Sequence, residues 1–341
     1  MSQRFLIAAF AAAMLAACTE EPSTSPSVDS TAEPSASPSA QPAAEPAAPA
    51  PAAQSAGAGD IPDRIVIERQ GVIPEGIEYD QTNRRFLVGS LGEGTVFEVG
   101  LDGRLTPFVT DDELVSSVGI EVDEERNRLL VCNSDRNVFG GSATGHAKLG
   151  IYALDSGERI SMIDLGAALG DSPEGAFFAN DVAVGADGTA YVTDTRQNLV
   201  YRVGNDGVPS VLHRFDGDAG PNGIVYHDGG YLLVVGLTSQ ALYKIPVDNP
   251  DAAAEVTLPE PLAGGDGMVW APDGRLAVVS NSTSRVILLS SDDDWATAEI
   301  AGIGTFEGQG TTAAVVGDDI FVVKPQFQDQ APPEIERVSI Q

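Results

Sequence analysis

The stretch GDGMVWAPDGRLAVVS, residues 265–280, decides the fold. A small polar turn carries the acidic Asp266, and a short apolar run follows it. The pair Asp273-Gly274 then leads into a second apolar run. Two short apolar runs joined by an Asp-Gly turn predict a β-hairpin.

The same hairpin pattern recurs along the chain. Its equivalent first positions are Glu75, Val118, Asn180, Asn222, Asp266 and Thr311, so the steps are 43, 62, 42, 44 and 45 residues. The one long step holds an insertion rich in Gly, Ser and Asn near residues 136–148. A repeat of this length, made of short strands without a helical pattern, is typical of propeller blades.

Six copies predict an all-β, six-bladed β-propeller of four-stranded blades over residues 61–341. In the first copy we expect strands at residues 76–79, 85–90, 95–101 and 104–109. The last copy supplies only three good strands, at residues 311–316, 320–324 and 335–340. Residues 64–69 are expected to provide its fourth strand, because pairing the two ends of the domain closes the ring and leaves no free sheet edge.

The first 60 residues predict export and anchoring. Residues 1–17 combine Arg4 with a short apolar stretch, as in a signal peptide. The motif Leu-Ala-Ala-Cys at 15–18 resembles a bacterial lipobox, which implies a lipid on Cys18. Residues 18–60 are rich in Pro, Ala and Ser, so we expect a disordered spacer. The expected location is the cell envelope, lipid-anchored at the periplasmic face of the outer membrane; an ordinary signal peptide and the inner membrane are the alternatives.

The chain is strongly acidic, with 50 Asp and Glu residues against 19 Lys and Arg. Nucleic acid requires a basic face, so we expect no nucleic-acid partner. Common catalytic motifs such as G-x-S-x-G and the phosphate-binding P-loop are absent from the sequence. The expected partners are a small molecule and, through the lipid, a membrane, with the protein a monomer.

The strongest functional signal lies in the register of the repeats. The innermost strand of each blade starts at the central tunnel, so equivalent positions converge on one axis. Four of the six carry oxygen donors, namely Glu75, Asn180, Asn222 and Asp266. Two carboxylates and two amides, without thiolate or imidazole, suit one hard divalent cation, above all calcium. The alternative is that Asn-Gly and Asp-Gly pairs simply form turns.

These motifs resemble those of the senescence marker protein/gluconolactonase family, the regucalcin-like six-bladed propellers. The resemblance covers residues 61–341 and rests on Pro-Glu-Gly at 74–76, Asn-Asp at 180–181, Pro-Asn-Gly at 221–223 and Gly-Asp-Gly-Met at 265–268. It implies that one divalent metal is bound by the four residues Glu75, Asn180, Asn222 and Asp266. It also implies an acid–base role near the substrate for Asp181, in a family whose lactonases hydrolyse sugar lactones.

One position departs from the family pattern. Gluconolactonase-like members usually have an Arg two residues before the second-motif Asn, where it holds substrate hydroxyls. This chain has Phe178 there, which predicts a less polar substrate-binding site. In a regular strand, Asp181 should also point away from the face of Asn180, unless the strand start is bulged.

Two classes of function follow from these observations. The first is a metal-dependent hydrolase of a lactone or ester, with the cation polarising the carbonyl and Asp181 or Asp266 accepting a proton from water. The second is a non-catalytic, membrane-tethered binding or scaffold propeller with a structural metal. Asp181 favours the hydrolase, whereas Phe178 and the tether favour a binding role; we favour the hydrolase.

Overall fold

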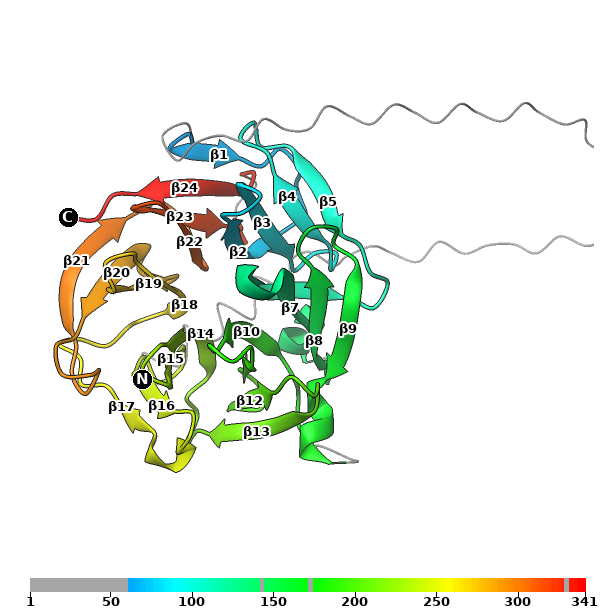
Figure 1. Cartoon of the computed structure of the whole chain (residues 1–341). Helices are drawn as coiled ribbons and strands as arrows, with labels where there is room; N and C mark the ends of the chain where they lie inside the picture. The colour runs from blue at the N-terminus through cyan, green and yellow to red at the C-terminus, as the bar shows by residue number, and fades with distance from the viewer. Residues whose placement is uncertain (1–60, 142–143, 171–173, 328–330) are drawn as a thin grey trace, which may run out of the picture.

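The computed structural model describes residues 61–141, 144–170, 174–327 and 331–341. The predicted signal peptide, Cys18 and the spacer lie outside these residues. Six four-stranded antiparallel sheets surround a central axis, which confirms the six-bladed β-propeller (Figure 1). In the part of the chain described, no helix is long and apolar enough to cross a membrane.

Five blades are each made of four strands that follow one another in the chain, counted from the axis outward. Blade 1 comprises β2 (Pro74–Asp80), β3 (Arg85–Ser90), β4 (Val96–Val99) and β5 (Leu105–Val109). Blade 2 comprises β6 (Ser116–Asp123), β7 (Arg128–Ser134), β8 (Ala147–Ala153) and β9 (Arg159–Asp164). Blade 3 comprises β10 (Ala179–Val184), β11 (Ala190–Asp194), β12 (Leu199–Val203) and β13 (Pro209–Arg214). Blade 4 comprises β14 (Pro221–His227), β15 (Tyr231–Gly236), β16 (Leu242–Pro246) and β17 (Ala254–Glu255), and blade 5 comprises β18 (Gly265–Trp270), β19 (Leu276–Ser280), β20 (Arg285–Ser290) and β21 (Glu299–Thr305).

Blade 6 joins the two ends of the domain, as the sequence predicted. Its strands are β22 (Ala313–Val316), β23 (Asp319–Lys324), β24 (Glu334–Val338) and the N-terminal β1 (Arg64–Val66), which pairs with β24. The buried Ile65 lies opposite Ile335 in this pairing. Glu334 forms ion pairs with Arg64 and with the buried Lys324, so both packing and charge hold β1 in place.

The described residues also form four short 3-10 helices: η2 (Glu124–Arg126), η3 (Arg136–Gly140), η4 (Leu165–Leu169) and η5 (Pro250–Ala252). The extra length of the long repeat is divided between η3, after β7, and η4, after β9. The sequence analysis placed it all near η3, although the segment around η4 also contains glycines, at Gly166, Gly170 and Gly175. Both segments lie at the end of the propeller where the inner strands begin, since β7 runs antiparallel to β6.

Five hairpins carry an Asp-Gly pair like that at 273–274, and the Asp-Gly turn forms in four of them. In each, the glycine has a positive φ and the aspartate Oδ1 accepts the backbone N–H two residues on; the pairs begin at Asp102, Asp187, Asp206 and Asp273. This bond fixes the turn locally. In the fifth turn the glycine with positive φ is Gly230 instead of Gly229, and His227 Nδ1 accepts the N–H of Gly229.

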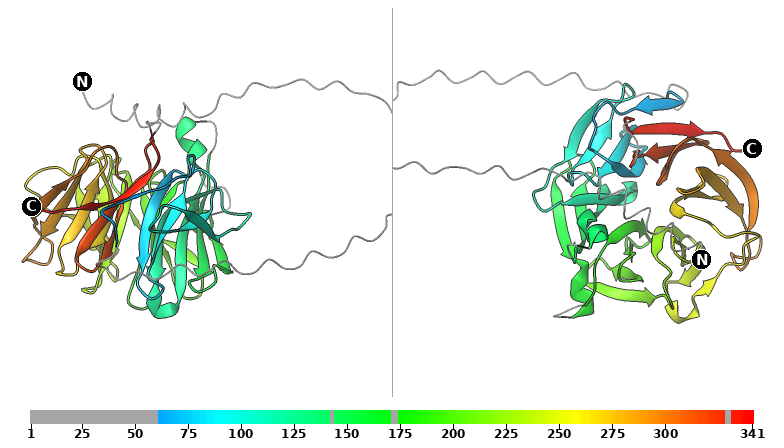
Figure 2. Two further views of the ribbon diagram at one scale, coloured as in Figure 1. Left: turned by 90° about the horizontal axis from the view of Figure 1, so that it is seen from above. Right: turned by 180° about the vertical axis from the view of Figure 1, so that it is seen from behind.

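The apolar core lies between neighbouring blades, in several clusters around the ring. At the closing junction, for example, Phe86 of blade 1 packs edge-to-face on Phe321 of blade 6, with ring centroids 5.3 Å apart. The inner strands stand around the axis, and the left view of Figure 2 shows the flat propeller edge-on. Each blade therefore holds the start of its inner strand at a fixed place on the axis.

Candidate metal ring and tunnel cavity

The inner strand of five blades begins with the same β-bulge. The register shifts between Pro74 and Ile77 in blade 1 and at the equivalent positions, which are Ser117/Ile120, Ala179/Val182, Pro221/Ile224 and Gly265/Met268. Two residues of the inner strand therefore stand opposite one residue of its neighbour. In blade 3 these two residues are Asn180 and Asp181. In a regular strand their side chains would point to opposite faces, but the bulge allows both to turn toward the axis.

The first residue of each bulge defines what we call the ring: Glu75, Val118, Asn180, Asn222, Asp266 and, in blade 6, Thr311. All but Glu75 are buried, and Glu75 is half-buried. Asp266 accepts side-chain hydrogen bonds from Asn222 and Asn281. The backbone carbonyl of Glu75 accepts a bond of 2.8 Å from Thr311 Oγ1, which ties blade 1 to blade 6 at this level.

Ionisation of the two ring carboxylates is disfavoured, chiefly by burial. Burial and the nearby charge of Asp266 raise the pKa of Glu75 well above its usual range. Burial also raises the pKa of Asp266 to about 7, although its two hydrogen bonds act in the opposite direction. No Lys or Arg among the described residues forms an ion pair with either carboxylate. Ionising both carboxylates is therefore costly, and no Lys or Arg ion pair in the described part of the chain offsets that cost.

The second residue of each bulge is glycine in four blades, for a steric reason. A Cβ on Gly76 would lie 2.4 Å from the carbonyl oxygen of Val118, and one on Gly223 would lie 2.3 Å from that of Asp266. Adjacent inner strands therefore approach too closely for a side chain here. In blade 3 this position is occupied by the acidic Asp181, whereas four other blades have glycine there.

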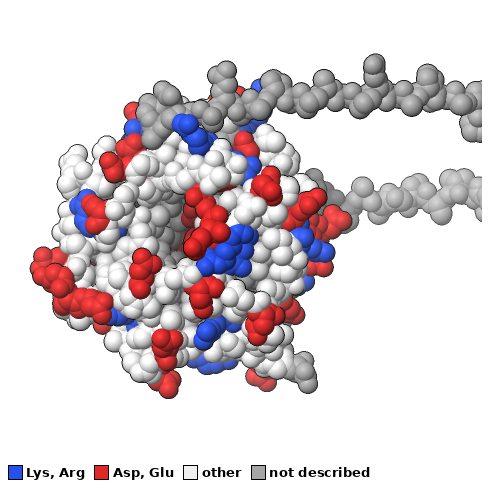
Figure 3. Space-filling view, in the orientation of Figure 1, with Lys and Arg blue, Asp and Glu red and all other residues white. Residues whose placement is uncertain are grey.

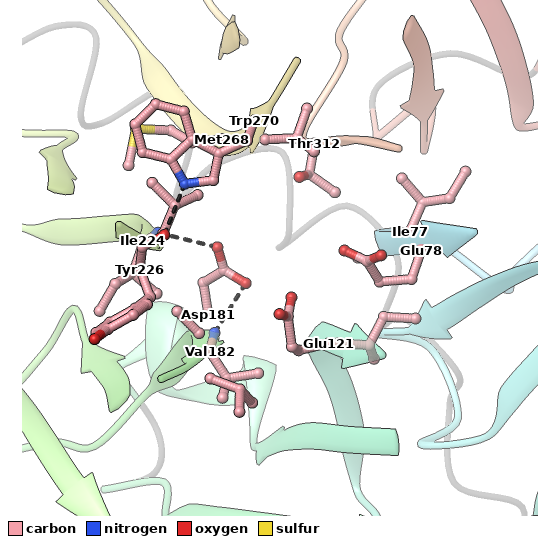
Figure 4. A pocket seen from close by; sticks show the side chains of 16 residues that line it. Ile77, Glu78, Glu121, Asp181, Val182, Ile224, Tyr226, Met268, Trp270 and Thr312 are labelled. Atoms are coloured by element: carbon pink, nitrogen blue, oxygen red, sulfur yellow. Dashed lines mark hydrogen bonds between the residues drawn. The ribbon is translucent and has the colours of Figure 1, made fainter. Parts of the chain in front are cut away.

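The Asp181 carboxylate has two roles in the geometry. It accepts the backbone N–H of Val182 at 2.9 Å and reaches blade 4, where it accepts the N–H of Ile224 at 3.2 Å. It also faces the cavity of the tunnel, as Figure 4 shows. Burial raises the pKa of Asp181 to about 7, while the two backbone bonds lower it. It is both a cap for a bulged strand and a candidate proton acceptor.

A cavity of about 210 Å³ opens beside Asp181 in the tunnel. Glu78 and Glu121 line one side, and Tyr226, Met268 and Trp270 line the other (Figure 4). Trp270 Nε1 donates to the Tyr226 carbonyl at 2.8 Å, which fixes the indole at the wall. The same face of the molecule is hollowed near its centre, with acidic side chains beside the hollow (Figure 3).

The sequence analysis missed Glu78 and Glu121. Burial and the charge of Glu121 raise the pKa of Glu78, and burial raises that of Glu121 to about 8. Both stand three residues after a ring position, where the other four blades carry only Ala or Val. Comparing the repeats at the position three residues after each ring residue would have revealed Glu78 and Glu121 in the sequence.

Phe178, expected in the substrate site, lies in the core between blades 2 and 3. Only 3% of it is exposed, and its ring packs edge-to-face on Phe139 from η3 at a centroid distance of 4.7 Å. It is not among the residues that line the cavity beside Asp181. Its backbone N–H donates to Asp194 Oδ1 at 2.9 Å, which holds the chain just before Asn180.

The ring fits a hard cation by its donor chemistry. Within the described part of the chain, no three His, Cys, Asp or Glu side chains form a cluster that could hold a metal alone. A cation on the axis would therefore use the amides of Asn180 and Asn222 together with the carboxylates of Glu75 and Asp266. Such a mixed oxygen set matches calcium best, and a bound cation would offset the cost of ionising the two buried carboxylates.

Comparisons with known proteins relate the chain to propellers by shape. No known protein-family model matches the sequence, and no curated protein matches it. Among solved structures, the allergen Mala s 1 of Malassezia sympodialis has a TM-score of 0.69 at 18% identity, covering 82% of this chain and 96% of the allergen. A gluconolactonase from Xanthomonas campestris has a TM-score of 0.57 at 16% identity, with 82% and 89% covered.

A third similar structure is a virginiamycin B lyase from Staphylococcus aureus, with a TM-score of 0.56 at 13% identity, covering 82% of this chain and 98% of the lyase. These structural neighbours therefore include gluconolactonase-type propellers and a propeller lyase. At such low identities the similarity establishes the shared fold.

Proposed function

We propose that the protein is a calcium-type, divalent-cation-dependent hydrolase of a lactone or ester. The observation that carries the proposal is the position of Asp181, an acidic side chain that lines the cavity and whose charge acts on both ring carboxylates. The match of Glu75, Asn180, Asn222 and Asp266 to the regucalcin-like motifs supports it, as does the fold shared with a gluconolactonase.

In this proposal the ring residues Glu75, Asn180, Asn222 and Asp266 hold the cation. When bound, it polarises the substrate carbonyl and stabilises the negative charge that develops on the carbonyl oxygen. Asp181 accepts the proton of the attacking water, because its carboxylate faces the cavity and is positioned by Val182 and Ile224. A pKa of about 7 suits a general base at neutral pH.

The cavity wall favours a neutral substrate with an apolar body. Met268 and Trp270 offer apolar surface. Burial raises the pKa of Glu78 and Glu121, so at neutral pH they would line the cavity mainly as neutral carboxylic acids, which can hydrogen-bond to a neutral substrate. The low polarity that the sequence attributed to Phe178 is thus supplied by other residues. A sugar lactone rich in hydroxyls is a poorer match to this lining than an aryl ester or an alkyl-substituted lactone.

A non-catalytic propeller with a structural metal is the second candidate. It is favoured by the bonds that Asp181 makes to two backbone N–H groups, since a capping role alone would explain an aspartate there. In either case, we propose that Cys18 carries a lipid and that the propeller is held in the cell envelope.

A substrate panel tests the proposal directly. Neutral lactones of increasing chain length and aryl esters would be incubated with the protein in excess calcium and, in parallel, in excess chelator. We expect hydrolysis that requires calcium, prefers the less polar substrates and disappears in Asp266→Ala. Absence of hydrolysis across the panel, together with calcium binding, would favour the structural-metal candidate.

A further inference from the structure

One register position beside the ring is polar only in some blades. The residue just before the ring residue pairs with a residue of the second strand, as in Pro74↔Ser90, Ala179↔Asp194 and Gly265↔Ser280. The position in question is the next residue along the second strand, directly after that partner. In blade order this position is Leu91, Ser134, Thr195, Leu237, Asn281 and Pro325. Thr195 and Asn281 belong to the two blades that contribute Asn180 and Asp266 to the ring.

Thr195 fixes which end of the Asn180 amide faces the axis. Its Oγ1 lies 2.7 Å from the carbonyl oxygen of Pro221, and because a carbonyl can only accept, the hydroxyl proton must point there. Toward Asn180, at 2.8 Å, the hydroxyl can then only accept, so Asn180 must present its NH2 group to Thr195. The amide oxygen is thereby left for the ring.

Asn281 is oriented by the same kind of argument. An ionised carboxylate only accepts, so the bond of 3.2 Å to Asp266 Oδ2 comes from Asn281 Nδ2. Its own oxygen accepts from Gln309 Nε2 at 3.4 Å, which matches that orientation. Asn281 is buried, and its bond holds the orientation of the Asp266 carboxylate, whose oxygens still have lone pairs for a cation.

We propose that Thr195 and Asn281 are positioning residues of the ring: they present oxygen lone pairs of Asn180 and Asp266 to a divalent cation. The inference rests on the proposed function, because it assigns these side chains a task toward the same cation. Of the two ends of an amide, only the oxygen attracts a cation, whereas the NH2 group repels it. If the Asn180 amide could rotate freely, the site would bind the cation less tightly. Thr195 also ties Asn180 to the carbonyl just before Asn222, so it couples two ring residues from adjacent blades.

The test is calcium titration of the full-length protein by calorimetry, with melting temperatures measured in chelator and in calcium. Thr195→Val keeps the shape of the side chain but removes the acceptor, and it should weaken calcium binding by about tenfold or more, as is usual for residues that orient metal ligands. Thr195→Ser restores the acceptor and should bind calcium within about threefold of wild type. Asn281→Leu, the residue type of blades 1 and 4, should also weaken binding by about tenfold.

Ser134→Ala is the matched control. Ser134 occupies the same register position in blade 2, and its hydroxyl donates to the Ala179 carbonyl at 2.8 Å as Thr195 donates to Pro221. Unlike Thr195, its hydroxyl bonds to that backbone carbonyl and not to the amide of a ring residue. It should lower the melting temperature equally in chelator and in calcium and leave the dissociation constant unchanged. For Thr195→Val, the rise in melting temperature produced by a fixed calcium concentration should shrink.

Two outcomes overturn the inference separately. If wild type binds calcium and Thr195→Val binds it equally well, Thr195 has only a structural role, although the proposed function stands. If wild type binds no calcium, the metal ring and the positioning role both fail. Calcium binding without any hydrolysis contradicts the catalytic proposal alone, and the affinity differences among the variants then still support the positioning role.

Discussion

Removing the charge of Asp266 should stabilise the metal-free protein near neutral pH, although it removes a proposed metal ligand. The perturbation is Asp266→Asn, which keeps the size of the side chain and an oxygen that can accept from Asn281. The reason is that burial disfavours the ionised carboxylate, and the nearby charge of Asp181 adds to this effect. If the site binds the proposed cation, the buried carboxylates should be strained when that cation is removed.

The magnitude follows from the pKa shift. The pKa of Asp266 rises from 3.8 to about 7 in the folded chain. A shift of about three units corresponds to roughly 4 kcal/mol. Because the folded state binds the proton more tightly, the free energy of unfolding of wild type should fall as pH rises from about 4 to about 7 and then level off. Asp266→Asn has no carboxyl to ionise, so its free energy of unfolding should not fall in this way. Its stability should therefore equal that of wild type near pH 4 and exceed it by at most about 4 kcal/mol above pH 7.

Urea unfolding in excess chelator at several pH values would measure this difference. Asp273→Asn is the matched control, because hydrogen bonds from Arg275 lower the pKa of that exposed aspartate, so its removal should give no stabilisation. If Asp266→Asn is less stable than wild type at pH 8 in chelator, the ring carboxylates are not strained and this account of the site is wrong.

Three further predictions concern other residues. Asp181→Asn should reduce hydrolysis by about a hundredfold or more, with calcium affinity within a few-fold of wild type; an unchanged rate would exclude Asp181 as the base. Phe178→Ala should destabilise the fold by about 3–5 kcal/mol in urea unfolding, because the ring is buried against Phe139; a loss of activity at unchanged stability would instead return Phe178 to the substrate site. Cys18→Ser should move the protein out of the membrane fraction or leave its precursor uncleaved, and membrane fractionation identical to wild type would contradict the lipid anchor.

The repeat made much of the architecture predictable from sequence. Hairpin signals such as Asp273-Gly274 are local, and their spacing counts the blades. The closing role of the segment around Ile65 followed from a missing fourth strand in the last repeat. Strand ends were less predictable: β1 ends at Val66 instead of residue 69, because only three of its residues pair with β24.

The site required information that is not local. Whether Asn180 and Asp181 can both reach the axis depends on the bulge against β11, and a bulge is a property of strand pairing. The burial of Phe178 depends on Phe139, which belongs to η3 of another blade. Thr195 was not recognised because its role depends on the pairing of β10 with β11 and on a contact with blade 4.

The most direct test of the central claim is the hydrolytic rate as a function of free calcium, measured beside calcium binding on the same preparation. The account predicts a rate near zero in chelator that rises with calcium and saturates with the dissociation constant found by titration, since one site serves both. Hydrolysis that continues unchanged in chelator, or that saturates at a calcium concentration unrelated to the measured binding, would contradict it.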